Sequence, residues 1–121
     1  MGLERRKAVR IEKSVMALYS MDAYAKNWDM TTVKDISEIG IRISTNRDFS
    51  IGETIMLRIK IPLEPFKWLE IKGKVISSSL VKDTKKERVL FHITQIEFIE
   101  LKDEDKKLIV KYISWYLNRR A

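Results

Sequence analysis

The stretch Thr54-Ile-Met-Leu-Arg-Ile-Lys-Ile61 places an apolar side chain at every second position. Alternate residues of an extended strand point to opposite faces, so this pattern is typical of a β-strand with one buried face. The same alternation occurs at Ile39, Ile41 and Ile43, upstream of this stretch. Pro62 ends the first stretch, because proline lacks the backbone N–H that a strand ladder needs. Both patterns predict a domain built mainly from strands.

Other segments extend this prediction to six strands. The remaining β-rich stretches are 15–19, 31–35 and 88–99, together with a strand that starts with 68–77. A charged hairpin tip is expected at 81–87. The alternation of the last strand slips between Ile93 and Ile96, which predicts a bulge there. Short strands separated by turn signals favour a small antiparallel barrel.

The hydrophobic period changes near the C-terminus. Asp103 is suited to cap a helix, and Glu104 and Asp105 are favourable in its first turn. Large apolar residues then recur at helical spacing, which predicts a helix over 103–119. Its aromatic residues, Tyr112, Trp115 and Tyr116, are interpreted as core packing rather than a partner surface. We therefore expect a mainly β fold, a six-stranded antiparallel β-barrel with a C-terminal α-helix packed against it.

Composition indicates one folded domain. The chain has 121 residues, with 45% hydrophobic and 34% charged residues and no cysteine. We expect a single domain over 1–121, divided into a flexible basic arm at 1–13, a barrel at 14–100 and the helix. No apolar run approaches the roughly 18 residues of a membrane span, and no signal peptide is visible, so a cytoplasmic location is expected. A net charge of +7 favours anionic partners.

Residues for catalysis or metal binding are scarce. The single histidine, His92, lies in a strand pattern, where a packed residue is the commoner role. With no cysteine and no second histidine, a zinc site is not expected, and the acidic residues lack calcium-loop spacing. We predict that the protein is not an enzyme, with no catalytic residue, no metal and no cofactor.

The most informative motif is Asp35-Ile-Ser37-Glu-Ile-Gly40, between two predicted strands. A carboxylate can accept two parallel hydrogen bonds, as the N1–H and N2–H edge of guanine would supply. The Ser37 hydroxyl can donate to a phosphate, and Gly40 permits a positive φ or a close ligand approach. The same residues also suit a plain turn closed by glycine, with no ligand at all.

A pair of arginines precedes this motif. Arg6 and Arg10 are four residues apart in the charged N-terminal arm. Arginines can grip phosphates with two hydrogen bonds, bind the O6 and N7 atoms of guanine, or stack on a purine. Such spacing is common by chance in an arginine-rich chain, so the pair gains meaning only together with the motif.

Together, Arg6-x-x-x-Arg10 and Asp35-x-Ser37-x-x-Gly40 resemble the PilZ domain family over nearly the whole chain. The resemblance implies a six-stranded barrel that binds the bacterial second messenger cyclic di-GMP. Arg6 and Arg10 would contact phosphates and guanine edges; Asp35 and Ser37 would bind a guanine edge, with Gly40 leaving room beside it.

The resemblance also implies how the signal is passed on. A basic residue at the place of Arg5 accompanies binding of an intercalated ligand dimer in PilZ-like domains. Ligand binding would order the arm, residues 3–12, and create a surface for a downstream protein of a motility, secretion or polysaccharide system.

Two alternatives remain open from the sequence. One is a small β-barrel that binds nucleic acid through its positive charge. Readers of single strands need exposed aromatic residues interleaved with basic ones on a sheet face, whereas Trp28, Trp68 and Trp115 are scattered in the sequence. We therefore expect no nucleic-acid partner. The other alternative is an interaction module that has lost ligand binding.

Overall fold

The computed structural model describes residues 9–10, 15–21, 27–83, 85 and 88–120. Within these residues, seven strands precede one helix. Their bounds are β1 (Val9–Arg10), β2 (Met16–Ser20), β3 (Asp29–Ile36), β4 (Gly40–Thr45), β5 (Thr54–Lys60), β6 (Trp68–Asp83), β7 (Arg88–Ile99) and α1 (Asp103–Arg120).

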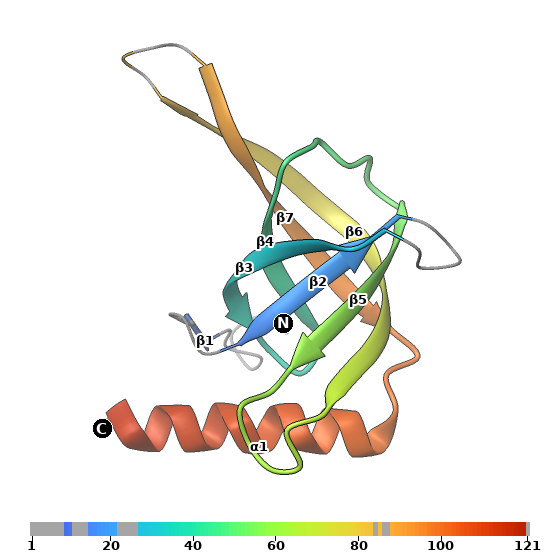
Figure 1. Ribbon diagram of the computed structural model, residues 1–121, viewed down its shortest axis with the longest axis vertical. Helices are drawn as coiled ribbons and strands as arrows, with labels where there is room; N and C mark the ends of the chain where they lie inside the picture. Colours follow the sequence, from blue (N-terminus) through green and yellow to red (C-terminus); the bar gives the residue numbers. More distant parts are fainter. Residues whose placement is uncertain (1–8, 11–14, 22–26, 84, 86–87, 121) are drawn as a thin grey trace, which may run out of the picture.

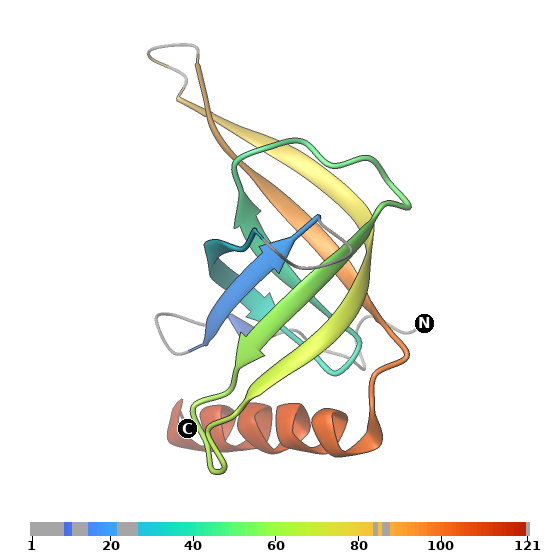
Figure 2. The same ribbon diagram turned by 45° about the vertical axis from the view of Figure 1, so that its right-hand side comes forward.

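Six of these strands, β2 to β7, form a closed antiparallel barrel. The sheet runs in the order β1-β3-β2-β5-β6-β7-β4, and a further pairing of β3 with β4 closes it. Helix α1 lies across one end of the barrel, and the β6–β7 hairpin projects beyond the opposite end (Figures 1 and 2). This arrangement confirms the fold predicted from the sequence.

The core fills the barrel interior and continues onto the helix. The predicted inward positions of β5, Ile55, Leu57 and Ile59, are fully buried. From α1, Ile109 and Tyr112 are buried in the same cluster. Burying each such side chain stabilises the fold by about 1.5–3 kcal/mol. The helix is thus part of the domain's core.

The helix aromatics divide between two environments. Tyr112 is fully buried, as predicted, and Tyr116 packs partly buried against the core. Trp115 is 39% exposed and stacks on Tyr112, with the Arg119 guanidinium over its ring. Core packing therefore holds for the first two residues, whereas Trp115 lies at the surface.

Three local features differ from the sequence predictions. The short strand β1 pairs with β3 inside the segment predicted as an arm. Strand β6 continues to Asp83, into the stretch 81–87 that was predicted as the hairpin tip. The expected bulge lies on β6, not on β7: Val75 pairs with Ile96 and Ser77 with Gln95, which leaves Ile76 as the extra residue.

Among the described residues, no helix has the length and apolar character needed to cross a membrane. The same part of the chain contains no cluster of three histidine, cysteine, aspartate or glutamate side chains able to hold a metal ion.

Candidate ligand-binding site

The turn between β3 and β4 is built by Ser37. Its backbone N–H donates to the Gly40 carbonyl at 2.9 Å, and its Oγ accepts from the Ile39 N–H at 3.2 Å. Ser37 is only 7% exposed. The serine therefore closes the turn, which is the plain structural role that the sequence left open.

Gly40 is required by the packing of β4 against β7. Its φ is not positive, so conformational freedom is not the reason for a glycine here. A Cβ at this position would lie 3.3 Å from the Cα of Glu97 and closer still to the Ile96 carbonyl oxygen. The close approach expected at Gly40 is therefore made by the backbone of the barrel itself.

Asp35 faces an arginine from the next strand. Arg42 of β4 is its Cα partner in the ladder. The Arg42 Nε and Nη2 atoms lie 2.7 and 2.6 Å from the same oxygen, Oδ2 of Asp35. The carboxylate is largely buried, with 13% side-chain exposure, while Arg42 is 49% exposed. This pair holds the carboxylate in a fixed orientation.

Sequence reasoning did not identify Arg42. A hairpin whose turn is Ser37–Gly40 pairs Ile36 with Ile41, and the next pair along the ladder is Asp35 with Arg42. This register could have identified Arg42 as the partner of Asp35.

The N-terminal strand approaches the same point from the other side of β3. In the β1–β3 ladder, Val9 pairs with Ile36 and Arg10 pairs with Asp35. Residues directly opposite in an antiparallel pair have Cα atoms about 4.5–5.5 Å apart. The backbone thus places Arg10 beside Asp35, although they are far apart in sequence. The other two predicted arginines, Arg5 and Arg6, lie outside the described residues.

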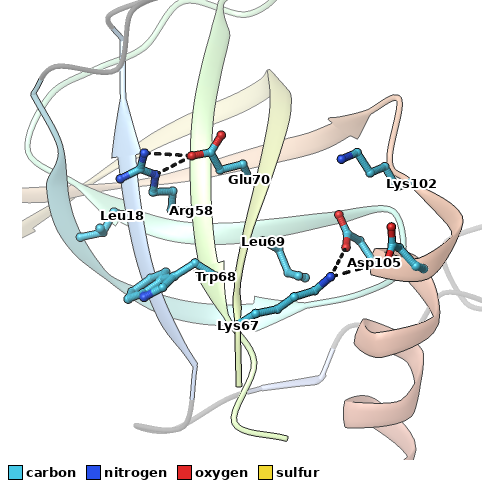
Figure 3. A pocket seen from close by; sticks show the side chains of 9 residues that line it. Leu18, Arg58, Lys67, Trp68, Leu69, Glu70, Lys102 and Asp105 are labelled. Atoms are coloured by element: carbon cyan, nitrogen blue, oxygen red, sulfur yellow. Dashed lines mark hydrogen bonds and ion pairs between the residues drawn. The ribbon is translucent and has the colours of Figure 1, made fainter. Parts of the chain in front are cut away.

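The β3–β4 hairpin, together with β6 and β7, lines one cavity of about 370 Å³. Its lining includes all three motif residues, Asp35, Ser37 and Gly40, together with Arg42 and Ile76. A larger hollow of about 540 Å³ lies elsewhere, against β5, β6 and the start of α1 (Figure 3). The motif cavity offers a carboxylate acceptor, a guanidinium donor and apolar walls, a combination suited to a polar aromatic ligand.

His92 lies outside this cavity, in β7, where its backbone pairs with Thr45 and Leu80. Its side chain is half-buried, and no described acid or nucleophile hydrogen-bonds to it. That surrounding fits a packed strand residue, as expected from the sequence.

A model of the PilZ domain family matches residues 4–115. The search of curated proteins found no match. Among solved structures, the inhibitor of motility MotI/DgrA from Bacillus subtilis is similar, with 23% identity and a TM-score of 0.70 over 96% of this chain and 53% of that one. The complex of MrkH from K. pneumonia with c-di-GMP shows 14% identity and a TM-score of 0.70, over 100% of this chain and 57% of that one.

A third similar structure is the PilZ domain of YcgR from Escherichia coli with c-di-GMP. It has 15% identity and a TM-score of 0.64, over 96% of this chain and 93% of that one. The chain thus spans about half the length of the first two proteins and nearly the whole of this third one. At identities of 14–23%, these structures establish only that the fold is similar. Family membership rests on the family model, which matches residues 4–115. The chain belongs to the PilZ domain family.

Proposed function

We propose that this protein is a receptor for cyclic di-GMP, bound between the N-terminal segment and the β3–β4 turn. The ligand-binding residues in this proposal are Arg5, Arg6, Arg10, Asp35, Ser37 and Gly40. The observation that carries it is the meeting of Asp35, Ser37 and Gly40 in one cavity, with the backbone of Arg10 paired to Asp35.

The state of Asp35 suits a guanine edge. Both contacts from Arg42 use Oδ2, so among the described residues nothing donates to Oδ1. Guanine N1–H and N2–H are two adjacent donors that a carboxylate can accept together. An adenine edge lacks this pair of donors, and a site built for them rejects an analogue without them strongly. Asp35 is therefore the residue that would select guanine.

Arginines would supply the phosphate contacts. Arg6 precedes Arg10 by four residues, and a ligand with two phosphates presents an anion to each. Arg5, next to Arg6, would favour an intercalated ligand dimer. The known complexes lend support by their fold: both MrkH and the YcgR PilZ domain are described with c-di-GMP.

The signal would pass through the N-terminal segment. The pairing of Val9 and Arg10 with β3 provides a starting point beside the cavity. Ligand phosphates would then fix residues 3–12 across this end of β3, and the new surface would be read by a downstream protein. In this account the chain binds and signals but carries out no chemistry, and it needs no cofactor.

Titration calorimetry with cyclic di-GMP tests the proposal. We expect wild type to bind and Arg10→Ala and Asp35→Ala each to lose about 1.5–3 kcal/mol, a roughly 10- to 150-fold weakening. Arg119→Ala and Asp48→Ala are the matched controls, because both residues are exposed and lie away from the motif cavity. Two ligands per chain would support binding of an intercalated ligand dimer beside Arg5, and one ligand per chain would contradict it.

Other outcomes would favour the alternatives. If wild type releases no heat with cyclic di-GMP, the receptor assignment is wrong and an interaction module becomes the better description. If wild type binds but both site variants bind equally well, the ligand lies elsewhere on the domain.

A further inference from the structure

The fold gathers two tryptophans that the sequence separates. The guanidinium of Arg58 lies over the Trp28 ring, 4.3 Å from its centre, and the Lys60 Nζ lies 5.9 Å from the centre of the Trp68 ring. Arg58 and Lys60 are alternate residues of β5, so they project from the same face of the sheet. Trp28 and Trp68 are therefore not scattered in space, contrary to the impression given by the sequence.

This face is the outer side of the barrel. The residues of β5 between and beside these cations, Ile55, Leu57 and Ile59, point inward and are fully buried. Trp68 is 40% exposed. We refer to the surface formed by Trp28, Arg58, Lys60, Trp68 and Lys72 as the tryptophan face.

The tryptophan face carries an excess of positive charge. The register places Lys60 opposite Trp68, Arg58 opposite Glu70 and Met56 opposite Lys72. Glu70 is paired with Arg58 at 2.9 Å, so its charge is already compensated. Lys72 is exposed and forms no ion pair with the described residues.

A hollow borders the tryptophan face beside Trp68. It has a volume of about 540 Å³ and lies between the Arg58–Glu70 pair and the start of α1 (Figure 3). Lys67 reaches across its floor to Glu104 at 3.6 Å and Asp105 at 3.8 Å. Lys102 lines the same hollow without an ion pair to any described residue. There is room here for a planar group to rest against the exposed Trp68 ring.

We propose that the tryptophan face binds single-stranded nucleic acid with little sequence preference. Single strands are held by aromatic rings on which bases stack and by cations that follow the phosphates. Here the Lys60 Nζ lies 5.9 Å from the centre of the Trp68 ring, so a base stacked on this ring would bring its phosphate to Lys60. Arg58 covers the Trp28 ring and is held by Glu70, so it contributes less to phosphate binding. A duplex hides its base faces, so a sheet face of this kind favours unpaired bases.

The surface is separate from the proposed cyclic di-GMP site. Along β6, Trp68 lies at the tryptophan face and Ile76 lies in the motif cavity. An extended strand rises about 3.3 Å per residue, so the two positions are separated by roughly 25 Å along the strand. Nucleic-acid binding therefore goes beyond the proposed receptor function, and each can fail without the other.

Fluorescence anisotropy with a labelled oligothymidylate of about 15 nucleotides tests the inference. We expect wild type to bind, with an affinity that falls steeply between about 50 and 200 mM salt. Trp68→Ala is expected to weaken binding by about 5- to 150-fold, the loss of one stacked base, while Trp68→Phe restores part of it. Lys60→Gln is expected to reduce the slope of log affinity against log salt by about 0.7.

The helix provides matched controls. Trp115 is 39% exposed, close to the 40% of Trp68, and it too has a cation over its ring, supplied by Arg119. Trp115→Ala and Lys111→Gln on α1 are therefore expected to leave oligonucleotide binding unchanged. Circular dichroism confirms that each variant is folded.

Several results would overturn the inference. The inference is wrong if the wild-type protein shows no salt-dependent binding of the oligothymidylate. It is also wrong if Trp115→Ala weakens that binding as much as Trp68→Ala does. If poly-L-glutamate displaces the oligonucleotide as well as unlabelled oligothymidylate does, the face is a general polyanion surface. If phosphatidylglycerol vesicles bind instead, and Trp68→Ala abolishes that binding, the face is a membrane contact.

Discussion

Replacing Gly40 with alanine separates the structural role of the motif glycine from its role towards a ligand. The added Cβ would lie 3.3 Å from both the Cα of Glu97 and the carbonyl carbon of Ile96, and nearer to the Ile96 oxygen. Carbon atoms pack best at about 3.5–4.0 Å, and all of these neighbours are backbone atoms that cannot rotate away. Strand β4 would have to shift away from β7.

The expected cost follows from this overlap. Overpacking of this kind costs about 1–3 kcal/mol, and alanine regains about 0.4–1 kcal/mol by restricting the unfolded chain. The free energy of unfolding should therefore fall by about 1–2 kcal/mol without any ligand. For a domain of this size, the melting midpoint should drop by about 3–10 °C.

Urea denaturation and thermal melting of the ligand-free protein measure this loss. Gly52→Ala is the control for destabilisation alone, because Gly52 has a φ of 93° but open space around its Cβ position. Both variants should be less stable, and only Gly40→Ala should also disturb the motif cavity. Wild-type stability in Gly40→Ala, combined with lost cyclic di-GMP binding, would show that the glycine serves the ligand and not the sheet.

Three further changes have defined outcomes. Ile43→Ala, at a fully buried core position, should lower the free energy of unfolding by about 2–5 kcal/mol in urea denaturation, and a loss below 1 kcal/mol would contradict the packing described. Arg42→Gln should cost less than about 1 kcal/mol of stability in the same assay, because Arg42 is 49% exposed and its pairing with Asp35 is weakened by solvent; a larger loss would show that the pair supports the fold. Burial raises the pKa of Tyr19 above its usual value, so the unfolded chain loses the phenol proton first, and wild-type stability should fall as the pH rises beyond about 10. Tyr19→Phe should show a smaller fall in melting temperature over that range, and an equal fall would assign the effect to other groups.

The sequence was most informative where residues repeat with a regular period. The buried positions Ile55, Leu57 and Ile59 follow directly from alternation, because every second residue of a strand faces the core. Helix α1 followed from the change to helical spacing after Asp103. Both signals are local, so a single sequence is enough to find them.

Elements whose sequences lack a regular hydrophobic pattern were not predicted. Strand β1 has two residues in a charged segment, so no hydrophobic pattern marks it. The far half of β6 begins with Ser77, Ser78 and Ser79, where alternation disappears. That part of the hairpin is joined to β7 by its backbone ladder and by polar pairs such as Ser78 with Thr94, whose hydroxyl oxygens lie 3.2 Å apart.

The candidate site likewise combines residues that the sequence motif predicted with residues that only the fold brings together. Asp35, Ser37 and Gly40 are close in sequence, and they line one cavity as the motif suggested. Arg42 and the pairing of Arg10 with Asp35 depend on strand register, which composition and motif spacing do not specify. The placement of Trp28 and Trp68 on one face depends on the neighbouring positions of β3, β2, β5 and β6 in the barrel.

The most direct test of the account compares cyclic di-GMP with cyclic di-AMP by titration calorimetry of the wild-type protein. Asp35 offers an acceptor to guanine N1–H and N2–H, and adenine has no matching pair of donors. We therefore expect cyclic di-GMP to bind at least about 100-fold more tightly than cyclic di-AMP. Equal affinities for the two dinucleotides, or no binding of cyclic di-GMP, would contradict it.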